Sequence, residues 1–124
     1  MTIETIIPPM MQRAYDFGHY APAVRANGFI FLSGIIGKGE EAEDEFRSAW
    51  ESAEMVLNAA GVTFADVVDS TLYIVDLAAN AAVMARVKDD FIMAPYPPST
   101  WIGVASLIRP GARAEIKLTA KVRP

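Results

Sequence analysis

Hydrophobic and polar positions follow two different periods along this chain, and each change of period marks an expected strand or helix. Residues 113–122 alternate apolar and polar side chains strictly, which is typical of a strand with one buried face. Asn27-Gly28 is a typical hairpin turn between two apolar runs. Further strands are expected at residues 2–7, 23–26, 29–33, 67–77 and 99–107. Within residues 67–77 the alternation places on one side Val68, Ser70, Leu72, Ile74 and Asp76.

Two segments have a helical period instead. Residues 40–60 carry an apolar stripe at spacings of three and four, namely Phe46, Trp50, Ala53, Leu57 and Ala60. Acidic residues crowd its first turns, where the helix dipole favours anions, so a solvated helix end is expected there and not a cation site. A second helix is expected from Asn80, its N-cap, to about Met93. Residues 10–20 have no clean period and are expected to form a loop.

This order of elements predicts an α+β fold in which two helices pack on one face of a mixed sheet, as a single domain over residues 1–124. Residues 29–36 are almost entirely apolar, so both faces of that strand are expected to be buried. Two helices can cover only one face of a sheet. We therefore expect another copy of the chain on the second face, with pockets at the seams between subunits.

Composition narrows the class of protein. The chain is 52% hydrophobic, which is high for a small monomer and agrees with self-association. It has no cysteine, which excludes disulfides and thiolate sites and makes a reducing cytoplasm the expected compartment. Fifteen acidic residues against eleven basic ones argue against a nucleic-acid partner. No signal-peptide pattern and no run of roughly 20 apolar residues is present, so no membrane partner is expected.

Few residues offer catalytic chemistry, and no cofactor is expected. One histidine with scattered carboxylates gives no metal-ligand spacing, and the chain has neither a phosphate loop nor a nucleophile elbow. His19 and Tyr20 lie together in a loop and could contact a ligand, although a hydrogen-bonding or core-edge role is commoner for such residues. Ser99 and Thr100 follow a rigid prolyl segment, which could hold two hydroxyls at a fixed place on a sheet edge.

Several segments, taken in order, resemble the RidA/YjgF family. They are residues 18–24, 29–34, 58–68, 72–77, 97–107 and 111–116, and together they span nearly the whole chain. The resemblance implies a chorismate-mutase-like fold, a homotrimer, and ligand clefts between neighbouring subunits. Active members hydrolyse reactive enamines and imines, such as 2-aminoacrylate, to 2-keto acids and ammonia. Members are also often labelled endoribonucleases or translation inhibitors, a role that the acidic balance of this chain disfavours.

The resemblance also shows where this chain departs from the family. Tyr20 keeps the family's tyrosine, but Ser99 stands where the family has the arginine that binds the substrate carboxylate. Lys117 stands where the family has an acidic residue that helps to position water, and Ile35 replaces a glutamine. A two-residue slip of the alignment would bring Glu115 to the acidic position instead.

These departures predict a cleft that still binds a small anionic metabolite, with Lys117 as the charge and with Ser99, Thr100 and Tyr20 as hydrogen-bond donors. Arg109 and Arg113 are alternative cations. The catalytic candidates are Tyr20, Lys117 and Glu115. The residues expected to bind the ligand are Ser99, Thr100, Trp101, His19, Ser33, Gly34 and Ile35.

The sequence therefore leaves several functions open. The first is a RidA-like protein that binds a small metabolite without being a standard 2-aminoacrylate deaminase. The second is an active enamine or imine deaminase, a hydrolase of C=N bonds, with a rearranged site. The third is a non-catalytic interaction module. A chorismate-mutase-type rearrangement rests on fold analogy alone.

Overall fold

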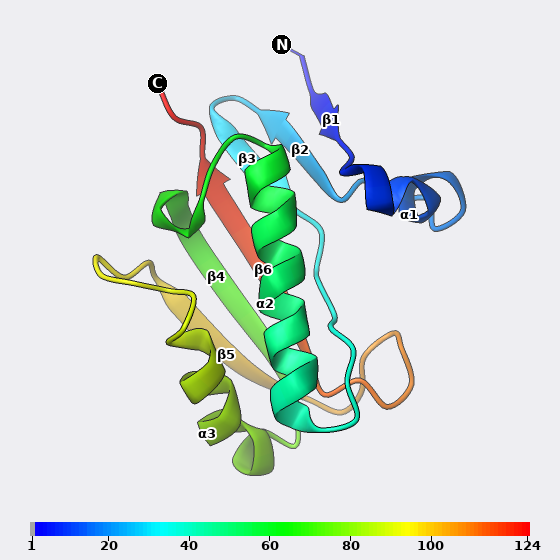
Figure 1. The fold of residues 1–124 in the computed structure, drawn as a ribbon, viewed down its shortest axis with the longest axis vertical. Coiled ribbons are helices and arrows are strands. Elements are labelled where there is room, and N and C mark those ends of the chain that lie inside the picture. Colours follow the sequence, from blue (N-terminus) through cyan, green and yellow to red (C-terminus); the bar gives the residue numbers. More distant parts are fainter. Residues whose placement is uncertain (1) are drawn as a thin grey trace.

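The computed structural model describes residues 2–124, which form one six-stranded sheet in the order β1-β2-β3-β6-β4-β5 (Figure 1). The strands are β1 (Glu4–Ile6), β2 (Ala23–Ala26), β3 (Phe29–Leu32), β4 (Val67–Val75), β5 (Ser99–Val104) and β6 (Ala114–Lys121). β4 and β5 pair in parallel, and the other neighbouring strands pair antiparallel. The mixed sheet predicted from the sequence is confirmed.

Two helices cover one face of this sheet, as expected. α2 (Ala42–Ala59) crosses in front of the central strands, and α3 (Leu77–Lys88) lies beside it against β4 and β5 (Figure 1). The shorter helical segments are η1 (Pro9–Met11), α1 (Gln12–Asp16) and η2 (Phe64–Asp66). None of the helices within residues 2–124 has the length and apolar character that crossing a bilayer requires.

The apolar stripe of α2 lies at the centre of the core. All five residues predicted for this stripe are buried, namely Phe46, Trp50, Ala53, Leu57 and Ala60. The indole of Trp50 packs against the rings of Phe64 and Phe91, with centroid distances of 5.9 and 6.2 Å. Opposite the helix, the inward-facing side chains of the two central strands complete the core, namely Leu72, Ile74, Ile116 and Leu118. The helical period of residues 40–60 and the alternation of the last strand are confirmed.

The structure corrects two of the expected elements. Residues 10–20 are not a loop throughout, because η1 and α1 occupy much of this segment. The second long helix begins before Asn80 and ends before Met93. Its cap is Asp76, which adopts a left-handed backbone conformation (φ 52°) and accepts a hydrogen bond from the N–H of Ala79. The Asn80 amide instead donates to the carbonyl of Val75 at 2.7 Å.

A β-bulge corrects the expected faces of β4. Val67 pairs with Ala120 and Asp69 pairs with Thr119, so Val68 is an extra residue in the ladder. Val67 is therefore buried, whereas Val68 is 39% exposed and does not share the inner side with the residues that follow it. At the sheet edge, β5 ends at Val104 and does not continue to residue 107.

The second face of the sheet carries no helix and keeps apolar side chains. Phe29 and Phe31 point to this face and are 37% and 43% exposed, whereas Ile30 and Leu32 are buried under the helices. Ile102 on β5 lies on the same open face and is 40% exposed. Within one chain, only one face of β3 is buried. Burial of both faces, as the sequence predicts, therefore requires a cover from outside the chain.

A buried ion pair joins α2 to the segment that leads into β6. The Glu45 side chain is 2% exposed, and its Oε1 lies 2.7 Å from Arg113 Nη1. Its other oxygen, Oε2, accepts the backbone N–H of Arg113 at 2.7 Å. A guanidinium nitrogen of Arg113 also donates to the carbonyl of Glu40. This network fixes the start of β6 against the first turn of α2.

We expect Glu45→Gln to lower the free energy of unfolding by about 2 kcal/mol, because hydrogen bonds to a charged acceptor contribute about 1.5–3 kcal/mol and the amide weakens them. Urea denaturation followed by circular dichroism measures this change. Glu54→Gln on the exposed side of the same helix is the matched control and should change stability by less than about 0.5 kcal/mol. Equal urea midpoints for the two variants would contradict the structural role of Glu45.

Candidate functional site

A cleft of about 400 Å³ opens where the chain after β3 meets the β5–β6 loop. Its lining residues are Tyr20, Ser33, Gly34, Ile36, Ile108, Arg109 and Glu115. They come from the loop before β2, from the segment after β3, and from the β5–β6 loop with the start of β6. In Figure 1 the last two segments, coloured cyan and orange, approach one another near the amino end of α2.

The cleft lies where β3 and β6 separate. The two strands pair up to Phe31 and Thr119, and pairing resumes where Ile35 and Ile116 exchange backbone hydrogen bonds of 2.8 and 2.9 Å. The step from Phe31 to Ile35 is four residues, whereas the step from Thr119 to Ile116 is three. One extra residue is therefore accommodated in the segment after β3, and this segment bends out of the ladder.

Gly34 leaves the space that the Glu115 carboxylate occupies. A Cβ atom at position 34 would overlap Oε2 of Glu115, so any larger residue there would displace this carboxylate from its place. Glu115 is half-buried and forms no ion pair with any basic side chain of residues 2–124. The cleft consequently contains a carboxylate that remains available to a ligand or to a water molecule.

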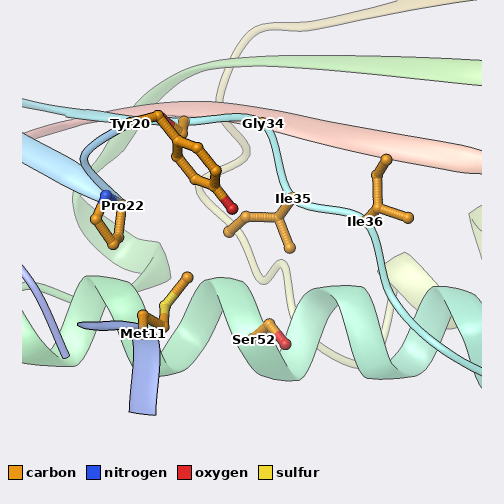
Figure 2. A pocket seen from close by; sticks show the side chains of 8 residues that line it. Met11, Tyr20, Pro22, Gly34, Ile35, Ile36 and Ser52 are labelled. Carbon is orange, nitrogen blue, oxygen red and sulfur yellow. The ribbon is translucent and has the colours of Figure 1, made fainter. Parts of the chain in front are cut away.

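Ser33 and Tyr20 form the wall of the cleft on the side of β2. The Ser33 hydroxyl donates to the carbonyl of Ala21 at 2.6 Å and so fixes the loop that carries Tyr20. Tyr20 is 46% exposed and also lines a smaller gap of about 110 Å³ between residues 33–36 and α2. Figure 2 shows its ring extending toward Ile35, with Ser52 of α2 across the gap. Tyr20 thus borders both this inner gap and the outer cleft.

Lys117 lies beside the cleft and is not among its lining residues. It stands opposite Thr71 on the open face of the sheet, and its ammonium group donates to the carbonyl of Leu32. That carbonyl lies in the interrupted part of the β3–β6 ladder, so Lys117 supplies a hydrogen bond there. Burial lowers the pKa of Lys117, and the nearby Glu115 carboxylate acts in the opposite direction.

The predicted residues of β5 lie elsewhere in the chain. Ser99, Thr100 and Trp101 are on the edge strand, and both β4 and β6 lie between this strand and β3. Ser99 and Thr100 are exposed, and the Ser99 hydroxyl accepts a hydrogen bond from the Trp101 indole N–H at 3.0 Å. Trp101 packs partly buried against the core. A single chain therefore does not bring these three residues to Tyr20.

The remaining predicted residues are divided between the inner gap and the surface. Ile35 is buried and lines the inner gap. His19 is exposed, has a positive φ of 59°, and lines a shallow hollow with Tyr15 and Asp16. Within residues 2–124, no group of three or more acidic or histidine side chains is placed to bind a metal ion.

The structure distinguishes the two alternative cations. Arg113 is bound to Glu45, whereas Arg109 lines the cleft. Sequence reasoning missed Ile36 and Ile108 as lining residues. Both are apolar side chains in irregular segments, where no periodic pattern indicates which way a side chain points.

The sequence of this chain is similar to those of a known protein family and of several individual proteins. The pattern of the family described as endoribonuclease L-PSP matches residues 10–122. The RutC family protein YjgH of Escherichia coli (strain K12) is 30% identical over 124 residues, covering 94% of this chain and 93% of that protein. A 2-iminobutanoate/2-iminopropanoate deaminase of Dermatophagoides farinae is 30% identical over 108 residues, covering 81% of this chain and 83% of the deaminase.

Comparison with solved structures supports the same family. A crystal structure of a YjgF-family member from Neisseria meningitidis has a TM-score of 0.86 and 31% identity, covering 100% of this chain and 98% of that one. The mixed sheet with its helices packed on one face is the chorismate-mutase-like fold that the sequence resemblance implies. Because the family pattern spans nearly the whole chain, this chain belongs to the RidA/YjgF family, the family described as endoribonuclease L-PSP.

Proposed function

We propose that this protein binds a small carboxylate metabolite in clefts between the subunits of a homotrimer, and that it is not a standard 2-aminoacrylate deaminase. The size and the lining groups of the cleft are the main support for this proposal. Its volume of about 400 Å³ falls within the usual range of small-molecule sites, roughly 300–1,000 Å³. It combines hydroxyl groups, a free carboxylate and a neighbouring positive charge, which suits a small polar ligand.

The proposed assembly follows from the open face of the sheet. Apolar side chains such as Phe29, Phe31 and Ile102 remain exposed there, and a second copy is a natural cover for them. The proposal requires each neighbouring subunit to bring its Ser99 and Thr100 toward the cleft, since within one chain these residues lie on the far edge strand.

Ser99 is the reason for proposing that the standard deaminase activity is absent. A guanidinium group at this position would bind a carboxylate through two parallel hydrogen bonds, which a hydroxyl group cannot do. A charge-assisted hydrogen bond contributes about 1.5–3 kcal/mol, so its loss weakens binding by about tenfold to a hundredfold.

A second function, imine hydrolysis with a rearranged site, is favoured by the position of Glu115. Its carboxylate lies in the cleft against Gly34 and forms no ion pair within residues 2–124. In this reaction water adds to the C=N carbon, ammonia leaves, and a 2-keto acid remains. Glu115 would accept a proton from the attacking water, and Tyr20 would orient the substrate. The similarity to a 2-iminobutanoate/2-iminopropanoate deaminase supports this alternative.

The binding proposal predicts that 2-oxobutanoate stabilises the protein against heat. A ligand at a hundred times its Kd stabilises the folded state by about 2.7 kcal/mol. For a chain of this size each 1 kcal/mol corresponds to roughly 3–6 °C in Tm, so a shift of several degrees is expected. The control is 2-butanone, which has the same carbon chain without the carboxylate and should leave Tm unchanged. Equal shifts with both compounds, or no shift with any 2-oxo acid, would contradict carboxylate binding and favour an interaction module.

The two catalytic alternatives separate in a deaminase assay. With 2-aminoacrylate generated enzymatically, we expect pyruvate release no faster than in the protein-free reaction, because the carboxylate-binding arginine is absent at position 99. The Dermatophagoides farinae deaminase serves as the positive control. Clear acceleration by the parent protein, abolished in Glu115→Gln, would overturn this expectation and establish the rearranged deaminase instead.

A further inference from the structure

We propose that Arg109 is the carboxylate-binding residue of this cleft and that it acts from the same chain as Tyr20, Ser33 and Glu115. This inference rests on the proposed binding of a small carboxylate, and it identifies the residue that recognises the ligand. The β5–β6 loop would then supply a guanidinium group to the cleft from a place in the chain other than position 99.

A hydrogen bond to the backbone fixes the position of the Arg109 side chain. One guanidinium nitrogen, Nη2, donates to the carbonyl of Gly37 in the segment that follows β3. Gly37 is itself buried against α2, where a Cβ atom would overlap the backbone of Glu45 and Ala49. The acceptor is therefore held by packing, and Arg109 is held at the wall of the cleft with it. A positioned side chain of this kind loses less conformational entropy on binding a ligand than a mobile one.

The charge of Arg109 is not neutralised by any carboxylate of residues 2–124. Five arginines form ion pairs with carboxylates, namely Arg25, Arg47, Arg86, Arg113 and Arg123. Arg109 forms none, and its contact with Gly37 uses one of the five N–H donors of a guanidinium group. The remaining donors are able to bind a carboxylate through two parallel hydrogen bonds, the geometry for which arginine is best suited.

Lys117 is the competing cation, and its surroundings are less suited to the role. Its ammonium group lies outside the cleft lining and is occupied by the carbonyl of Leu32 in the interrupted ladder. Withdrawing it would leave that carbonyl without this donor. Lys117 therefore has a structural function that explains its presence, whereas the half-buried Arg109 forms no ion pair within residues 2–124.

The arrangement of charges also indicates the ligand class. Arg109 provides the positive charge for a carboxylate, and Glu115 with Tyr20 provides polar groups for a substituent on the adjacent carbon. A 2-oxo or 2-imino carboxylate of a few carbons has both features and fits a cleft of about 400 Å³. The apolar side chains of Ile36 and Ile108 line the same cleft and suit a short aliphatic tail.

The test is isothermal titration calorimetry with sodium 2-oxobutanoate, using the full-length protein and variants at positions 109 and 117. Arg109→Gln keeps an amide donor for the Gly37 carbonyl but removes the charge, and we expect its Kd to rise by about tenfold to a hundredfold. Arg109→Lys keeps the charge without the planar fork and should bind with intermediate affinity. Arg86→Gln removes one exposed positive charge on α3 and is the matched control, with the Kd of the parent.

The possible outcomes separate this inference from the proposed function. If the parent does not bind 2-oxobutanoate, the proposed carboxylate binding fails, and the assignment of Arg109 fails with it. If the parent binds and Arg109→Gln binds equally well, only the assignment of Arg109 is overturned; loss of binding in Lys117→Met would then assign the charge to Lys117. Circular dichroism and Tm verify folding of each variant. Should Arg109→Gln not fold, parent-like affinity of Arg109→Lys would overturn the assignment, and weakened affinity would support it.

Discussion

The unpaired face of the sheet is the physical constraint on which the rest of this structure depends. Two helices bury the side chains on one face, while Phe29, Phe31 and Ile102 remain partly exposed on the other. Removing such apolar surface from water is favourable by about 25 cal/mol per Å², and this gain opposes the entropy cost of association. Polar residues of β6, including Lys117 and Thr119, lie on the same face. A mixture of apolar and polar groups is typical of surfaces through which subunits associate.

The candidate site arises from an irregularity at the end of this face. One extra residue after β3 interrupts the ladder with β6, and the interruption has two consequences. It leaves the carbonyl of Leu32 to be satisfied by Lys117, and it places Gly34 under the carboxylate of Glu115. The β5–β6 loop then closes the opposite side through the contact between Arg109 and Gly37. The functional groups of the cleft are therefore fixed by backbone pairing and packing on both sides.

Much of the fold could be predicted because its strongest signals are periodic. The apolar stripe of α2 and the strict alternation of β6 each identify a buried face without knowledge of any partner. Two corrections involve local backbone conformations that leave no periodic signal. The bulge at Val68 moves one residue to the other face, and the left-handed Asp76 starts α3 before Asn80. The helical turns within residues 10–20 are too short to establish a recognisable period.

The site was less predictable than the fold. Tyr20, Ser33, Gly34 and Glu115 were expected from the sequence, and they line one cleft. Ser99, which was also expected in the site, lies on the distant edge strand β5, and the order of strands in the sheet is a long-range property that no periodic pattern indicates. The choice between Arg109 and Arg113 depended on long-range contacts: Arg113 pairs with a glutamate on α2, far away in sequence, and Arg109 does not pair with any carboxylate in residues 2–124.

We propose that copies of this chain cover the open face of the sheet and form the clefts at their seams. The most direct test is the mass of the unmodified protein in solution, measured by sedimentation equilibrium at micromolar concentration. We expect a single species of three times the 13.5 kDa chain mass. A species that remains at 13.5 kDa across the concentration range would contradict it, because Phe29, Phe31 and Ile102 would then stay exposed to water.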